Sequence, residues 1–161
     1  MATTSPALPR TIAGVRIMTS VLFLLFGEYK VAGPGFAHGK FQEYLHDYIT
    51  TTALGFYRPV LSGFVLPHAV FFGYTVGVVE LLIGICLLLG LWVRPAAVVG
   101  FLFLLNLILA AWWEPGHSAP LWRYFGARLD TLPLILLLII FYAADAGRVW
   151  GLDGRRRLRS N

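Results

Sequence analysis

The sequence predicts an all-α membrane protein: a bundle of four transmembrane helices with a short amphipathic helix in the first outer loop. Of its 161 residues, 58% are hydrophobic and 13% are charged, and the mean hydropathy is +0.72. Soluble domains are about 45–50% apolar and about 25% charged. The apolar residues gather in four runs, and most basic residues flank those runs. Together these features indicate a single polytopic membrane domain.

The four apolar runs define the expected helices. They cover residues 11–31, 65–92, 96–113 and 128–146, and each is long enough to cross the ~30 Å hydrocarbon core of a bilayer, which takes about 20 residues. Pro67 falls in the first turn of the second run, where proline is tolerated. We expect residues 1–10 to form a short tail, residues 11–153 the membrane domain, and residues 154–161 a basic C-terminal tail.

The long connection between the first two runs contains an amphipathic pattern. Gly33-Pro34-Gly35 stops the first helix, and apolar residues then recur at helical spacing at Phe41, Tyr44, Leu45, Tyr48 and Ile49. The pattern predicts a helix of roughly three turns, too short and too polar to span, that lies at the membrane interface or caps the bundle. The threonines at 50–52 are β-branched, so we expect that stretch to be extended or frayed.

Basic residues predict the orientation. Eight lie on the side of the termini and the 92–95 loop: Arg10, Arg16, Arg94, Arg148, Arg155, Arg156, Arg157 and Arg159. Five lie on the other side: Lys30, Lys40, Arg58, Arg123 and Arg128. The positive-inside rule then places both termini in the cytoplasm of a bacterium, with the chain in its cytoplasmic (inner) membrane. The lipid bilayer is the expected partner of the basic residues, and no nucleic acid is expected.

The second run carries one charge, Glu80, near its middle. Gly73, Gly77 and Gly84 share its helical face, and such a face is expected to pack inside the bundle rather than against lipid. Asn106 lies at a similar depth in the third run, so we expect a hydrogen-bonded pair between Glu80 and Asn106, with Arg16 and Lys30 at other depths. The pair could join two helices, or it could serve a small proton or solute transporter.

Polar and aromatic residues form a second layer at the outer ends of the runs: Glu28, Tyr29, Lys30, His68, Trp112, Trp113 and Asp130. One interpretation is an interfacial belt with ion pairs, since tryptophan and tyrosine favour that depth. The other is a ligand pocket for an amphipathic molecule such as a quinone headgroup, which needs hydrogen-bonding groups beside an apolar slot.

A third layer is expected at the inner boundary, where Asp145 should pair with one of the arginines in the set Arg16, Arg94 and Arg148. No metal site is expected, because the four histidines do not have metal-ligand spacing. The single cysteine, Cys86, excludes a dithiol redox centre within the chain. Catalytic residues cannot be assigned from these patterns.

Several motifs in order along the chain resemble the DoxX family of small four-helix bacterial membrane proteins. They are Arg16 followed by Gly27-x-x-Lys30-Val31, Phe41-Gln42-Glu43-Tyr44-Leu45, Pro67 leading to Glu80 and Gly84, Leu87 to Leu91 with Arg94, and Ala146-Gly147-Arg148 with Leu152-Asp153. The resemblance implies a redox setting, since some members look like subunits of thiosulfate:quinone oxidoreductase or quinol-oxidase systems.

On this resemblance we expect an accessory subunit of a membrane redox or electron-transfer assembly, with possible quinone contact. A quinone-binding oxidoreductase subunit of the thiosulfate:quinone type is the alternative within the family. The expected partners are a larger membrane redox complex or further copies of the chain.

Overall fold

The computed structural model describes residues 7–33, 35–112 and 131–155, and within these ranges the chain is helical and contains no strand. The α-helices are α1 (Ala7–Ala32), α2 (Phe41–Asp47), α3 (Arg58–Val60), α4 (Ala69–Leu89), α5 (Val93–Ala110) and α7 (Thr131–Ala143). Wider or tighter helical turns flank them: η1 (Phe36–Lys40), η2 (Tyr48–Thr52), η3 (Leu61–Val65) and η4 (Leu66–His68). The all-α class is therefore confirmed for the described residues.

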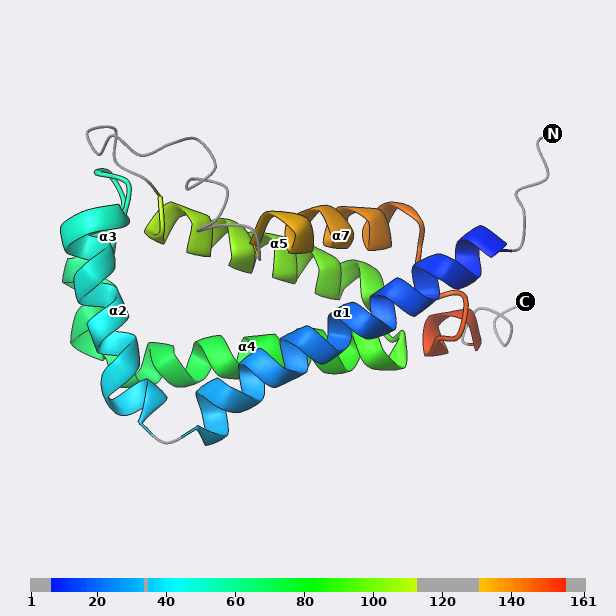
Figure 1. Ribbon diagram of the computed structural model, residues 1–161, viewed down its shortest axis with the longest axis horizontal. Coiled ribbons are helices and arrows are strands. Elements are labelled where there is room, and N and C mark those ends of the chain that lie inside the picture. Colours follow the sequence, from blue (N-terminus) through cyan, green and yellow to red (C-terminus); the bar gives the residue numbers. More distant parts are fainter. Residues whose placement is uncertain (1–6, 34, 113–130, 156–161) are drawn as a thin grey trace.

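Two helix pairs and a cap make up the architecture (Figure 1). α1 packs against α4, which runs back in the opposite direction, and α5 pairs with α7 in the same way. The segment from η1 to α3 crosses one end of the molecule, from the start of α4 to the end of α5. We call residues 36–65 the outer cap.

Three helical segments in the described residues are long and apolar enough to cross a membrane: Ala7–Ala32, Arg58–Leu89 and Val93–Ala110. α7 is equally apolar but has 13 residues. The chain is therefore a multi-pass membrane protein. A fourth span and cytoplasmic termini stay predictions.

Small residues allow α1 and α4 to approach closely. A Cβ added to Gly27 would lie 2.8 Å from the Gly77 carbonyl oxygen, and one added to Gly84 would lie 2.8 Å from Cγ of Leu24. Gly73, Gly77, Glu80 and Gly84 are all buried. The glycine face of α4 thus packs inside the bundle, as its spacing predicts, with α1 as its partner at Gly77 and Gly84 and with Ala37 of η1 at Gly73.

The outer cap differs from its prediction at one end. Residues 50–52 were expected to be extended or frayed, and that prediction is wrong: η2 continues the helix to Thr52, and the chain becomes extended at Ala53. The threonine hydroxyls bond back onto this helix: Thr50 Oγ1 donates to the His46 carbonyl at 2.8 Å and Thr51 Oγ1 to the Asp47 carbonyl at 2.6 Å.

The cap is tied to the rest of the bundle at both of its ends. Its apolar face buries Leu45 and Leu61 in a small cluster with Ala69 of α4 and Ala110 of α5. Thr52 Oγ1 donates to the Ala110 carbonyl at 3.1 Å, and Leu54 N donates to the Leu109 carbonyl at 3.2 Å. The amphipathic stretch therefore covers the ends of α4 and α5, and its apolar side faces protein.

The path between the cap and α4 bends at a proline. Pro67 has no N–H to donate, and the turn around it is a tight 3-10 helix, η4, whose last residue, His68, has a φ of −116°. Regular α-helix resumes at Ala69, four residues after the predicted start of the second span. The bend lets α3 lie across the end of the molecule while α4 runs along it (Figure 1).

The inner end of the bundle is closed by the C-terminal segment. α4 ends at Gly90, whose φ of 61° suits glycine, and Trp92 precedes α5. The Asp153 carboxylate accepts hydrogen bonds from Trp92 N at 2.9 Å and Val93 N at 3.0 Å, and Asp153 N donates to the Gly90 carbonyl at 2.9 Å. Asp153 thus caps the start of α5 from far along the chain.

Candidate functional site

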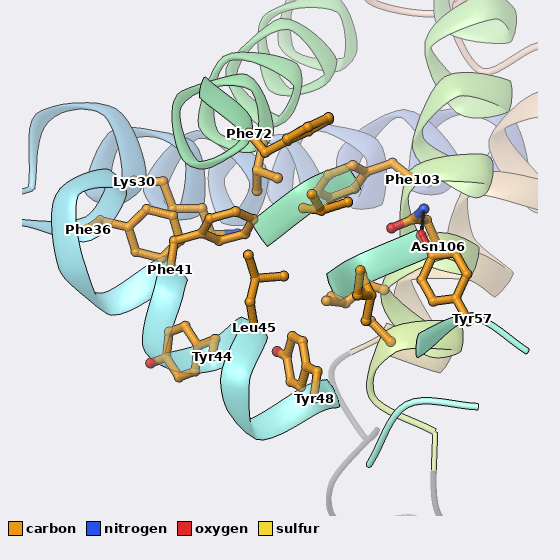
Figure 2. Close-up of a pocket in the computed structure, with 15 residues that line it drawn as sticks. Lys30, Phe36, Phe41, Tyr44, Leu45, Tyr48, Tyr57, Phe72, Phe103 and Asn106 are labelled. Carbon is orange, nitrogen blue, oxygen red and sulfur yellow. Dashed lines mark hydrogen bonds between the residues drawn. The ribbon is translucent and has the colours of Figure 1, made fainter. Parts of the chain in front are cut away.

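A cavity of about 270 Å³ lies where the outer cap meets α4 and α5 (Figure 2). Its walls are mainly aromatic and aliphatic, with rings from Phe36, Phe41, Tyr44, Tyr48, Tyr57, Phe72 and Phe103. The cap supplies most of these rings because its apolar face turns inward. Apolar walls with a few polar groups are typical of sites for small amphipathic ligands.

Two polar groups lie at opposite sides of this cavity (Figure 2). On one side is Lys30, from the last turn of α1, beside Phe36 and Phe41. On the other side Asn106 of α5 donates through Nδ2 to the Tyr57 hydroxyl oxygen at 2.5 Å. The cavity therefore combines aromatic walls with hydrogen-bonding groups at two ends.

Glu80 is paired with Lys30 rather than with Asn106. Lys30 Nζ lies 2.5 Å from Glu80 Oε1, and the two side chains are 20% and 5% exposed. The predicted Glu80–Asn106 pair is therefore wrong, and so is the expectation that no cation reaches the depth of Glu80.

The register of α1 against α4 explains this correction. A Cβ on Gly77 would lie 2.9 Å from Cβ of Lys30, so the Lys30 backbone passes α4 at the level of Gly77, about one turn from Glu80. The prediction placed the end of α1 at the outer surface. In the structure the cap covers that end, and the long apolar stem of Lys30 carries its ammonium group inward.

The predicted outer layer does not gather around one pocket. Among its described members Lys30 alone lines the cavity. Glu28 is exposed, and Trp112 is 39% exposed. Trp113 and Asp130 lie outside the described residues.

The other two members of that layer make contacts elsewhere. The Tyr29 hydroxyl accepts a hydrogen bond from Lys40 Nζ at 3.0 Å, and this bond raises the pKa of Lys40. His68 Nδ1 lies 3.0 Å from the Phe64 carbonyl oxygen. Tyr29 lies on α1 and His68 at the bend before α4, and neither lines the cavity.

The inner layer splits into two parts. Asp145 lies 2.6 Å from Arg148 Nε and 3.8 Å from Arg94 Nε, and Arg94 also stacks on the Tyr142 ring at 5.5 Å. Arg16 stands apart from this cluster. It is fully buried, and its Nη2 donates to the Trp150 carbonyl at 3.0 Å. Arg16 thereby holds the C-terminal segment against α1.

Sequence reasoning missed the aromatic walls of the cavity. The spacing of Phe41, Tyr44 and Tyr48 was visible, but an amphipathic face can meet either lipid or protein, and the spacing does not decide between them. The described residues contain no group of three or more histidine, cysteine, aspartate or glutamate side chains placed to hold a metal ion. A ligand in this cavity would meet rings, one ammonium group and the Asn106–Tyr57 pair.

Comparison with known proteins supports the family. The family model for DoxX matches residues 11–113, well over half of the chain. No curated protein and no solved structure was found to match the chain. The matched range contains Arg16, Lys30, Glu80 and the whole outer cap, and so both the α1–α4 interface and the cavity. The chain therefore belongs to the DoxX family, as the order of its motifs predicted.

Proposed function

We propose that this protein is a small accessory subunit of a membrane redox assembly and that the cavity under the outer cap receives the ring of a quinone. The observation that carries the proposal is the cavity itself: aromatic walls with Lys30 at one side and the Asn106–Tyr57 pair at the other. A quinone presents a flat apolar ring with two carbonyl oxygens, and this arrangement offers stacking surfaces together with hydrogen-bond donors.

The electrons come from a partner in this proposal. The chain has one cysteine, so it has no dithiol pair of its own. A partner subunit of the redox assembly would reduce or oxidise the ring, while this chain binds and orients it. An oxidoreductase subunit of the thiosulfate:quinone type is a specific form of the same proposal.

For the membrane arrangement, we propose four spans in the bacterial cytoplasmic membrane with both termini in the cytoplasm. The bias of eight basic residues against five supports this orientation. The outer cap and its cavity would then lie at the periplasmic side. We propose a helix-joining role for Glu80 rather than a role in transport, since it is 3% exposed and paired with Lys30.

The test is direct binding of decylubiquinone to the purified protein in dodecylmaltoside, measured by equilibrium dialysis. Val76 lines the cavity, whereas Val78, on the same helix, is 44% exposed outside it. We expect Val76→Trp to fill the cavity and weaken binding at least tenfold. The matched control, Val78→Trp, should bind like the wild type. Equal binding by all three proteins, or no binding by the wild type, would show that the cavity is not a quinone site.

A further inference from the structure

The two ends of the cavity differ in the hydrogen bonds they can make, and this difference bears on the redox state of a bound ring. At one end is Lys30, whose ammonium group has three N–H donors and no acceptor. One donor is used by Glu80 Oε1 at 2.5 Å, and Nζ also lies 5.9 Å from the centre of the Phe36 ring. The donors that remain are open to an acceptor atom, whether of water or of a ligand.

The opposite end is more permissive. Asn106 Nδ2 donates to the Tyr57 oxygen, so the Tyr57 O–H hydrogen is not used in that bond and can go to a ligand. The Asn106 side-chain oxygen is an acceptor. This end can therefore meet either a carbonyl oxygen, through Tyr57, or a hydroxyl hydrogen, through Asn106.

A quinone and its quinol differ at these two positions. Each oxygen of the quinone is a pure acceptor, whereas each oxygen of the quinol also carries a hydrogen that needs an acceptor. At the Lys30 end the cavity walls are the Phe36 and Phe41 rings (Figure 2), and Glu80 is not one of the residues that line the cavity. The second oxygen of Glu80 accepts no hydrogen bond from the described residues, but Glu80 is outside the lining, so a quinol hydrogen at that end would lose its partner in water without finding an acceptor on the rings that face it, which costs affinity.

From these contacts we infer that the cavity selects the oxidised quinone over the quinol, with Lys30 as the residue that sets the preference. This inference rests on the proposed function and deepens it. One carbonyl oxygen of the ring accepts a hydrogen bond from Lys30, and the opposite carbonyl accepts one from Tyr57. The expected preference is about tenfold in Kd, corresponding to about 1.4 kcal/mol.

The experiment compares Kd for decylubiquinone and decylubiquinol under anaerobic conditions, again by equilibrium dialysis in dodecylmaltoside. The wild type should bind the quinone about tenfold more tightly. Lys30→Arg, which still offers only donors, should keep that preference. Lys30→Met should bind both forms with similar affinity. Where Lys30→Met is too unstable to purify, the double variant Lys30→Met/Glu80→Gln removes both charges and should likewise bind quinone and quinol with similar Kd.

The outcomes separate the two proposals. If neither form binds the wild type, the proposed quinone site itself is wrong. If both forms bind and the quinol binds as tightly as the quinone, or more tightly, the site exists but the preference inferred here is refuted. A preference that persists unchanged in both the Lys30→Met and the double variant would show that Lys30 does not set it.

Discussion

The Lys30–Glu80 ion pair makes a quantitative prediction about stability. Lys30→Met keeps the length and apolar stem of the side chain and removes its charge, which leaves the Glu80 carboxylate at a site that is 3% exposed. We expect a loss of about 3–5 kcal/mol in the free energy of unfolding, the usual cost of stranding one member of a buried ion pair. In a chain of this size that loss lowers Tm by roughly 10 °C.

The reverse substitution should cost less. Glu80→Gln strands the Lys30 ammonium group, but the Lys30 side chain is 20% exposed and lines the cavity, where water can reach it. We expect a loss of about 1–2 kcal/mol, in the range for a hydrogen-bonding partner removed from a partly buried group. The double variant leaves no stranded charge, so it should be more stable than Lys30→Met alone.

The assay is thermal unfolding of the four proteins in one detergent, followed by helical circular dichroism. The matched control is Lys40→Met, because Lys40 bonds to the Tyr29 hydroxyl at an exposed position of the outer cap and its loss should shift Tm by a degree or two at most. The reasoning is refuted if Lys30→Met unfolds like Lys40→Met, or if the two single effects simply add in the double variant.

Two further predictions concern packing and capping. Gly27→Ala should destabilise the protein by about 2 kcal/mol or more, because its Cβ would lie 2.8 Å from the Gly77 carbonyl oxygen and Leu81 N, both backbone atoms. A Cβ at Gly14 would have no atom of the described residues within 4 Å, so Gly14→Ala should stabilise helix α1 by up to about 1 kcal/mol. Similar Tm shifts for Gly27→Ala and Gly14→Ala would contradict the close approach of α1 and α4. Asp153→Ala should cost about 1–2 kcal/mol by removing the acceptor for the N–H groups of residues 92 and 93, as read from urea unfolding in mixed micelles. Asp153→Asn should keep much of that stability, and a loss as large as that of alanine would argue against the capping role.

Some features of the site could be predicted from the sequence. The spacing of Gly73, Gly77 and Glu80 predicted one buried face, and α1 and the start of the outer cap cover that face in the structure. The periodicity of residues 41–49 predicted the amphipathic helix of the cap. These predictions depend on which residues share a helical face, which local periodicity determines directly.

The sequence alone could not predict the partner of Glu80, for a physical reason. Pairing depends on how far α1 slides along α4, and that register is set by contacts such as Gly27 against Gly77, which involve residues fifty positions apart. Assigning depth from helix ends placed Lys30 at the surface and Asn106 beside Glu80. The close glycine packing instead brings Lys30 within one turn of Glu80.

Composition, apolar runs and motif order by themselves determined the helical membrane class of the protein and its family, because these depend on how each stretch interacts with lipid and water. The tertiary structure alone decided that the outer cap folds inward, that its rings enclose a cavity with Lys30 and Asn106, and that Asp153 reaches back to α5. Such contacts join residues far apart in the chain, and the free energy that selects them comes from packing whole helices together.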